Sequence, residues 1–449
     1  MGSTRTILEL VHQRTSQLAL ELGSEIDQLQ LNFPRAYRQS RWLHMQKYSS
    51  WCESVGIKSD RLQPKLVEGH GIGLFAKEDI STGEVLITVP RKAYLTVQRH
   101  GELAKVLKAH PILNLVNTCA LALALLYEAF RKDSFWADYI SILPAYEDSP
   151  FSFSEEELTA IKHTSCFSKV DSMVRNICRH YAYIYNLFFT ERPDFGESEI
   201  TPVTFTFENF RWAMFMATSR GNSLPSTENK SNRNPNSLAF IPHWDLLNHD
   251  SSVPRCSEYD AENKAVRFAA GKSWHKDEQV FTSYGNRTNE DFLVHYGFVP
   301  ANGDNYATVI HLGFAANDSS YKLRSEIMQK HNFNANENFC LMKNRVVAID
   351  NSILRFSLIF VANKEQLSML KATDDPVPVD EPWRNKAVEF LSKRLTLMAK
   401  ACSAGISKAP RQVVRPSIQM FVDMEVKLYE ECADFVKTPE MWPPTLTPP

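Results

Sequence analysis

Hydrophobic and polar residues follow different periods along this 449-residue chain. Between residues 7 and 51, apolar side chains recur at helical spacing among charged ones, which predicts an N-terminal helical segment over residues 1–63. Residues 71–76 and 84–90 are short apolar runs, and the turn-forming residues 81–83 lie between them. This second pattern predicts short strands joined by a tight turn, and therefore a small β unit after the N-terminal helices.

Helical periodicity returns in the middle of the chain, between residues 118 and 216, and predicts a helical insertion of about residues 100–235. Strand-like sequence resumes at residues 238–242. A second hairpin is expected beyond it, with residues 265–269 against residues 279–283. The β unit is therefore predicted to be split in two by the helical insertion.

The C-terminal part of the chain is predicted to be mainly helical. Thr288 is a candidate N-cap and Gly297 a candidate C′ residue of a short helix. Longer helices are expected over residues 319–331, 383–404 and 416–437. We therefore expect an all-α domain over residues 304–437. The last segment, residues 438–449, contains five prolines, which predicts a disordered tail.

Composition narrows the classes of partner and of compartment. The 50 basic and 52 acidic residues nearly cancel, so nothing favours nucleic acid as a partner. The eight cysteines form no C-x-x-C pair, which argues against structural zinc. Scattered cysteines favour reduced thiols and therefore a cytoplasmic protein. The nucleus is expected as a second location. The longest apolar run, residues 119–127, is well short of the ~20 residues that span a membrane. We expect a monomer that binds neither nucleic acid, membrane nor metal.

Three short motifs with chemical potential follow one another along the chain. They are Gly71-Ile72-Gly73-Leu74-Phe75-Ala76, Trp244-Asp245-Leu246-Leu247-Asn248-His249 and Ser283-Tyr284-Gly285. The first could be a dinucleotide-binding fingerprint, but such a fingerprint needs a helix directly after it, and a strand and a turn are predicted instead. In this order, with the helical insertion between the first two, the motifs resemble the split SET-domain methyltransferases of the Rubisco large-subunit methyltransferase type.

The resemblance covers roughly residues 35–440 and implies an α+β fold. A SET-domain β fold over residues 64–303, split by the helical insertion, would be followed by a Rubisco-methyltransferase-like substrate-binding domain. S-adenosyl-L-methionine would be the cofactor. Within this group, the chain most resembles the actin-histidine N-methyltransferases. The matching stretches are residues 179–185, 210–213, 219–222 and 284–289. This likeness implies methyl transfer to a ring nitrogen of a histidine in actin, the expected protein partner.

The resemblance also implies roles for individual residues. The residues expected to bind the cofactor are Arg41, His70, Gly71, Ile72, Arg220, Asp245, Asn248, His249, Tyr284 and Phe298. The residues expected to be catalytic are Tyr284, Asn222 and Arg287, and those expected to bind the substrate are Asn222, Trp244 and Arg287. By resemblance, Arg41 and Arg220 would hold the methionine carboxylate, whereas Asn222 and Arg287 would hold the target imidazole. His70 departs from the family, which has an acidic residue at that position.

The chemistry of these side chains agrees with the implied roles. S-adenosylmethionine carries a carboxylate, an ammonium and a sulfonium, so its pocket requires a guanidinium, carbonyl acceptors and an electron-rich aromatic ring. Arg220, Asn248 and Tyr284 are residues of these types. Methyl transfer depends on the alignment of the nucleophile with the methyl carbon and on the exclusion of water, and it requires no metal.

Other interpretations remain open. A lysine methyltransferase shares every cofactor feature, and only the substrate channel, where Asn222 is expected, would separate it from a histidine enzyme. The C-x-C zinc cluster that follows the SET domain of many histone enzymes is missing from the sequence. A non-enzymatic adaptor with an inactive SET domain would keep the fold without the chemistry. Taken alone, Asn222 is also an ordinary turn residue, and Tyr284 an ordinary strand residue.

Overall fold

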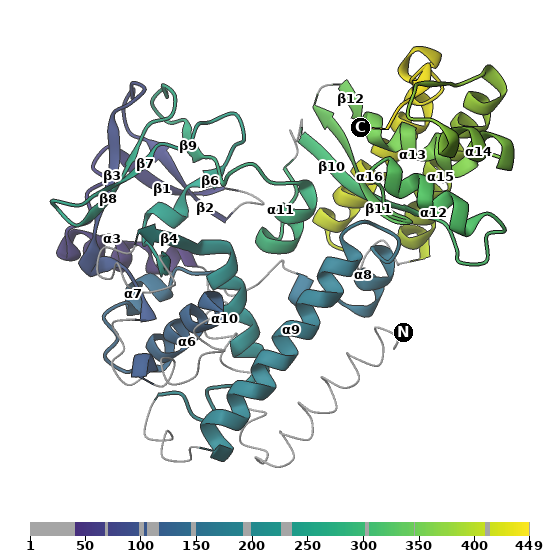
Figure 1. Cartoon of the computed structure of the whole chain (residues 1–449). Coiled ribbons are helices and arrows are strands. Elements are labelled where there is room, and N and C mark those ends of the chain that lie inside the picture. Colours follow the sequence, from purple (N-terminus) through teal and green to yellow (C-terminus); the bar gives the residue numbers. More distant parts are fainter. Residues whose placement is uncertain are drawn as a thin grey trace. The chain divides into compact units, whose positions relative to one another are not determined.

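The computed structural model describes residues 41–67, 71–97, 103–105, 116–144, 150–191, 199–225, 236–300, 305–344, 346–408 and 414–448. Contacts within the chain divide it into two compact units (Figure 1). Unit 1 comprises Met1–Ser152 and Asp171–Asn286, and unit 2 comprises Phe153–Val170 and Arg287–Pro449. The described residues 153–170 and 287–300, which the sequence grouped with the SET domain, therefore make their contacts mainly within unit 2.

The described β structure of unit 1 consists of three small sheets. The first has the strand order β1 (Leu62–Val67), β2 (Gly71–Ala76), β9 (Gln279–Thr282) and β6 (Asn248–His249). The second has the order β3 (Val85–Pro90), β8 (Ala265–Ala269) and β7 (Ser257–Asp260). The third pairs β4 (Gly221–Pro225) with β5 (Asn236–Phe240). The pairing of β6 with β9 is parallel, and the other pairings are antiparallel.

The strands lie close to where the sequence predicted them, but the predicted pairing is wrong. β2 pairs with β1 and β9, whereas β8 pairs with β3 and β7. Neither expected hairpin forms, because a tight hairpin needs a loop of about two to five residues. Residues 77–84 separate β2 from β3 and residues 270–278 separate β8 from β9, and both loops are longer than that. Contacts distant in sequence therefore select the strand partners.

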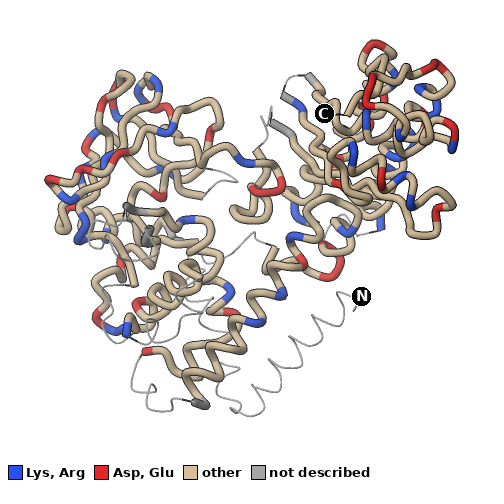
Figure 2. The backbone as a smooth tube through the Cα atoms, viewed as in Figure 1, with Lys and Arg blue, Asp and Glu red and all other residues tan. Residues whose placement is uncertain are grey.

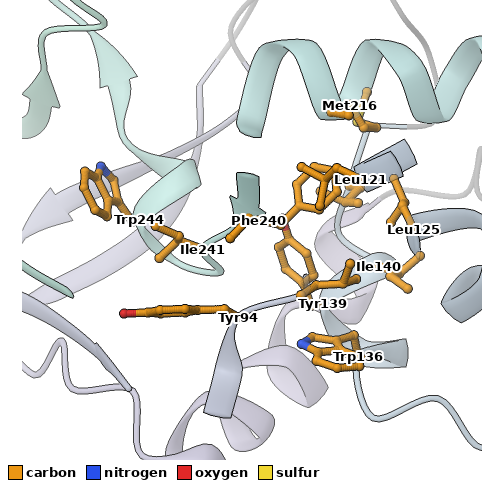
Figure 3. Close-up of a cluster of buried hydrophobic side chains, with 14 of the residues drawn as sticks. Tyr94, Leu121, Leu125, Trp136, Tyr139, Ile140, Met216, Phe240, Ile241 and Trp244 are labelled. Carbon is orange, nitrogen blue, oxygen red and sulfur yellow. The ribbon is translucent and has the colours of Figure 1, made fainter. Parts of the chain in front are cut away.

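The predicted helical insertion is confirmed among the described residues, since helices occupy the chain between β3 and β4. These helices include α6 (Asn117–Phe130), α7 (Ala137–Ile140), α9 (Phe167–Asn186) and α10 (Phe207–Arg220). The N-terminal helical segment is described only from η1 (Arg41–His44) and α3 (Met45–Val55) onward. In the core of unit 1, side chains of α6 and α10 surround the rings of Tyr139 and Phe240 (Figure 3). This core fixes the segments that carry the candidate site.

Unit 2 combines helices with a sheet of three described strands and a short two-stranded sheet. The helices are α8 (Glu155–Ala160), α11 (Asn289–Tyr296), α12 (Tyr321–Lys330), α13 (Asn351–Val361), α14 (Lys364–Ala372), α15 (Glu381–Lys408) and α16 (Pro416–Phe435). The strands are β10 (Asn305–Gly313), β11 (Asn336–Asn344) and β12 (Val346–Ile349), paired antiparallel in that order. The three long helices predicted in this region are confirmed as α12, α15 and α16.

The expectation of an all-α domain over residues 304–437 is wrong, because β10, β11 and β12 lie within it. In β10 the side chains of Thr308, Ile310 and Leu312 are buried, and those of Val309 and His311 between them are exposed. This period of two is the mark of a half-buried strand. The overall α+β class is confirmed.

The tail is ordered, contrary to the predicted disorder. Residues 438–448 contain η8 (Pro439–Met441) and β14 (Thr445–Leu446), and β14 pairs with β13 (Val377–Pro378). Trp442 is buried, and its Nε1 donates to the Val436 carbonyl at 2.7 Å. Prolines exclude a continuous α-helix here but permit a short 3-10 turn and extended chain, and burial of apolar side chains then stabilises the tail.

Charge is distributed evenly along the described parts of both units. Figure 2 shows Lys and Arg interspersed with Asp and Glu, and the formal net charge of the whole chain is −2. No helix in the described segments has the length and apolar character needed to cross a membrane. The described residues also contain no group of three or more metal-binding side chains close together.

Candidate functional site

Two of the three motifs meet where β6 and β9 end. Because these strands run parallel, their carboxyl ends lie at the same edge of the sheet, which brings His249 close to Tyr284. The backbone N–H of Tyr284 donates to Nδ1 of His249 at 3.1 Å, and the two ring centroids are 5.1 Å apart. Nδ1 is therefore the acceptor nitrogen of the neutral imidazole, and Nε2 carries its proton. The hydroxyl of Tyr284 donates to the Leu247 carbonyl at 2.8 Å, which fixes the ring.

The glycine-rich motif supplies a close backbone approach beside this edge. A Cβ atom at Gly73 would lie 2.6 Å from Nε2 of Gln279 and 3.0 Å from Nδ2 of Asn248, so a larger residue there would displace these two side-chain amides. Both amide nitrogens are buried and make no hydrogen bond to any residue that the structure describes. Buried donors usually have a partner, so they favour a ligand or water at this point.

Gly71 and Ile72 of this motif, both predicted to bind the cofactor, differ in which of their atoms could contact a ligand. Gly71 has a φ of 78°, a left-handed conformation that favours glycine. The side chain of Ile72 is buried in the core of unit 1, so only its backbone could contact a ligand. His70 lies outside the described residues. Arg41 begins η1, and its side chain is likewise outside what the structure describes.

Arg220 ends α10 and is anchored to the second motif. Its Nη1 donates to the Asp245 carbonyl at 2.6 Å and lies 3.5 Å from Oδ2 of the same residue. The side chain of Arg220 is 19% exposed and that of Asp245 is 2% exposed. Oδ2 of Asp245 also accepts a hydrogen bond from the hydroxyl of Tyr139 at 2.6 Å. A buried carboxylate therefore balances the guanidinium on one side, and Nε and Nη2 remain to bind an anion.

Asn222 lies two residues beyond Arg220, in β4. Its Nδ2 donates to the Arg220 carbonyl at 3.0 Å, so Oδ1 is the acceptor that the side chain can present to a ligand. Trp244 begins η7 (Trp244–Leu246), and its buried ring lies against Phe268 at 6.4 Å between centroids. The guanidinium of Arg255 lies 5.8 Å from the centroid of the Trp244 ring. A substrate would meet only the small exposed part of this tryptophan.

Arg287 and Phe298 belong to unit 2. The guanidinium carbon of Arg287 lies 5.3 Å from the centroid of the Tyr296 ring, and Phe298 packs against Phe292 at 5.4 Å. Thr288 caps α11 by accepting from the Asp291 N–H at 3.1 Å, which fixes the start of the helix directly after Arg287. These contacts hold both residues locally within unit 2.

Sequence reasoning missed two residues of the site in unit 1. Gln279 lies in β9 opposite Phe75, and Tyr139 lies in the four-residue helix α7. Nothing in the local pattern around either residue distinguishes it from an ordinary strand or core position. Both are recognised only through contacts distant in sequence, with Gly73 and Asp245 respectively.

Residues 71–285 match the family described as the SET domain. Proteins named actin-histidine N-methyltransferase from Mus musculus and Homo sapiens are each 28% identical to this chain over 393 residues. The match covers 84% of this chain and 64% of theirs, so the chain spans less than two thirds of the length of these relatives. The predicted SET domain and the likeness to these relatives are confirmed.

Solved structures show the same fold. "Crystal structure of the SET domain of LSMT bound to Lysine and AdoHcy" is similar with a TM-score of 0.63 and 20% identity, covering 88% of this chain and 90% of that one. "Structure of Rubisco LSMT bound to AdoMet" is similar with a TM-score of 0.60 and 17% identity, covering 88% and 93%. At this level of identity the likeness establishes the SET-domain fold.

Proposed function

We propose that this chain, whose residues 71–285 match the SET-domain family, transfers a methyl group from S-adenosylmethionine to a ring nitrogen of a histidine in actin. The proposal depends mainly on one observation at the sheet edge where β6 and β9 end. The rings of His249 and Tyr284 lie together there, and the buried side-chain amides of Asn248 and Gln279 lie close to Gly73. The names of the relatives support the choice of actin histidine as the target. Solved neighbours with AdoMet or AdoHcy bound support the choice of cofactor.

The residues of unit 1 fit the cofactor in their chemistry. The anchored guanidinium of Arg220 suits the carboxylate, and the amide donors of Asn248 and Gln279 suit acceptor atoms of the adenosine. The aromatic ring of Tyr284 suits a sulfonium. When bound, the cofactor supplies an electrophilic methyl group. Arg41, His70, His249, Asp245 and Phe298 belong to the same proposal by resemblance.

The target histidine requires a choice between two ring nitrogens. Oδ1 of Asn222 can accept the N–H of the target imidazole, because Nδ2 is held by the Arg220 carbonyl. The opposite nitrogen then has its lone pair available for the methyl group. It gains the carbon as the sulfonium becomes a thioether, and the methylated ring afterwards releases its N–H proton to water. By resemblance alone, Arg287 is proposed to bind a target imidazole, and Trp244 to line the approach of the substrate.

Mass spectrometry of purified actin after incubation with the full chain and S-adenosylmethionine tests the proposal. A gain of one methyl group on a histidine is the expected result. Methylation confined to lysine would overturn the histidine assignment and favour a protein-lysine methyltransferase. That second candidate is supported by neighbours whose structures contain lysine or monomethyllysine.

The same proposal includes the setting in which the protein works. It would be a monomer that binds actin, without a nucleic-acid or membrane partner, in the cytoplasm and with the nucleus as a second location. Light scattering after size-exclusion chromatography measures the mass in solution, and a dimer would contradict this part of the proposal. Imaging of the tagged full chain in cells measures its location.

A further inference from the structure

Tyr139 is buried in the hydrophobic core of unit 1, within the cluster of Figure 3. Its ring centroid lies 6.4 Å from those of Trp51, Tyr48 and Phe240. Three aromatic neighbours from α3 and β5 therefore fix the plane of the ring. Its hydroxyl consequently has a fixed position, and it donates to Oδ2 of Asp245 at 2.6 Å. A core tyrosine is thus tied to the second motif.

The bond from Tyr139 persists over the physiological pH range. Burial first, and then the charge of Asp245, raises the pKa of the Tyr139 hydroxyl well above 10.0. The hydroxyl therefore remains a donor. The carboxylate that it contacts is 2% exposed, and a buried carboxylate must have such partners to remain charged.

Asp245 in turn holds Arg220 at two points. The backbone carbonyl of Asp245 accepts from Nη1 at 2.6 Å, and Oδ2 lies 3.5 Å from the same nitrogen. The oxygen that contacts the Tyr139 hydroxyl is therefore also the oxygen nearest the guanidinium. Loss of the hydroxyl would allow the carboxylate to turn, and the guanidinium would lose a fixed neighbour.

We infer that Tyr139 is a positioning residue for the cofactor: acting through Asp245, it orients Arg220 so that the free N–H groups of the guanidinium face the carboxylate of S-adenosylmethionine. The inference rests on the proposed function, because Arg220 must be the residue that binds this carboxylate. It predicts that Tyr139 matters for ligands that have the carboxylate and not for ligands that lack it.

Tyr94 provides a matched control within the same core. It is also buried, it appears in the same cluster of Figure 3, and its hydroxyl donates to the Val89 carbonyl at 3.1 Å. Tyr94→Phe and Tyr139→Phe remove the same atom from the same core. Both variants should lower the melting temperature, but only the second removes a bond that leads to Arg220.

Calorimetric titration of the full chain with S-adenosylmethionine and with its decarboxylated form tests the inference. Tyr139→Phe should weaken binding of S-adenosylmethionine by about 10- to 150-fold, as expected for one lost hydrogen bond to a charged group. It should leave the decarboxylated ligand within about twofold, and Tyr94→Phe should leave both ligands unchanged. The preference of the protein for the carboxylate-bearing ligand should therefore fall in Tyr139→Phe alone.

An unchanged preference in Tyr139→Phe would overturn the inference, whether neither ligand is affected or both are weakened equally. If Tyr139→Phe fails to fold, Asp245→Asn replaces it, because the amide keeps an acceptor for Tyr139 and loses the charge beside Arg220. An equal loss for both ligands in Asp245→Asn would be decisive against the inference. If the wild-type chain binds neither ligand, the proposed function itself fails and the inference fails with it. The wild-type titration therefore separates the two failures.

Discussion

Replacing Asn222 with valine should weaken methylation of histidine far more than it weakens the fold. Asn222 lies in β4 opposite Ala239, and valine is well suited to a strand. The substitution removes the hydrogen bond of 3.0 Å from Nδ2 to the Arg220 carbonyl. It also removes Oδ1, the acceptor proposed for the N–H of the target imidazole.

The two losses differ in size. Loss of one neutral hydrogen bond lowers the free energy of unfolding by about 0.5–1.5 kcal/mol. Loss of the acceptor leaves a desolvated imidazole N–H without a partner, which raises the barrier by about 1–3 kcal/mol and lowers kcat/KM by about 5- to 150-fold. A valine wall would suit the aliphatic stem of lysine, so the variant should accept a lysine peptide better than the wild type does.

The assay is mass spectrometry of actin peptides with histidine or lysine at the target position, from mildly acidic to alkaline pH. The wild-type rate on histidine should rise through the reference pKa of ~6.5 and level off near neutrality. The rate of the variant on lysine, with a reference pKa of ~10.4, should still increase at alkaline pH. Asn222→Asp keeps an oxygen acceptor, so it should retain more histidine activity than Asn222→Val. The reasoning is refuted if Asn222→Val methylates histidine as fast as the wild type, or if the wild type accepts only lysine.

Three further predictions concern activity and stability. Tyr284→Phe loses the hydrogen bond to the Leu247 carbonyl. It should lower the single-turnover rate by about 10- to 100-fold and leave the cofactor affinity, measured by calorimetry, within about threefold. An unchanged rate with weakened cofactor binding would make Tyr284 only a binding residue. Burial raises the pKa of the Glu425 carboxyl in the folded protein above its ordinary value of 4.5. The protonated carboxyl therefore favours the folded state: its full contribution to the free energy of unfolding is present below pH 4.5 and is lost as the pH rises through the folded pKa. Glu425→Gln cannot ionise and should flatten this fall in denaturant titrations, whereas an unchanged pH slope would exclude Glu425 as its cause. Arg324 donates to the Ile359 carbonyl at 2.6 Å, so Arg324→Met should lower the free energy of unfolding by about 2–4 kcal/mol; a loss under about 0.5 kcal/mol in denaturant titration would contradict this.

Features governed by local chemistry were predictable from the sequence. The side chain of Thr288 caps α11 together with Asp291, and Gly297 ends the helix with a φ of 79°, both as expected. Capping depends on residues within one or two turns of each other, so a short stretch of sequence contains the necessary information. The long amphipathic helices were predictable for the same reason.

Features governed by distant contacts were not predictable in this way. One partner of β2 is β9, which lies about two hundred residues further along the chain, and only the folded backbone brings the two together. The structure of the tail was unpredictable for the same reason. Its prolines excluded a continuous α-helix, but they gave no information on the buried position of Trp442, which depends on the folded core. For the site, the family resemblance gave the roles proposed for Arg220 and Tyr284, but the link from Tyr139 exists only in three dimensions.

Gly221 separates Arg220, which is proposed to bind the carboxylate of the cofactor, from Asn222, which is proposed to bind the target imidazole. A Cβ atom there would overlap the Ala217 carbonyl and approach Leu121 Cδ2 to 3.2 Å, so the end of α10 is pressed against α6. The φ of Gly221 is −68°, which any residue can adopt, so the requirement is steric. Close packing at this point fixes where the helix ends and β4 begins. Arg220 and Asn222 therefore occupy fixed places on either side of it, and Nδ2 of Asn222 donates to the backbone carbonyl of Arg220 at 3.0 Å. A change that shifts the backbone at this point should for this reason move both side chains, so cofactor binding and the choice of target nitrogen are expected to change together.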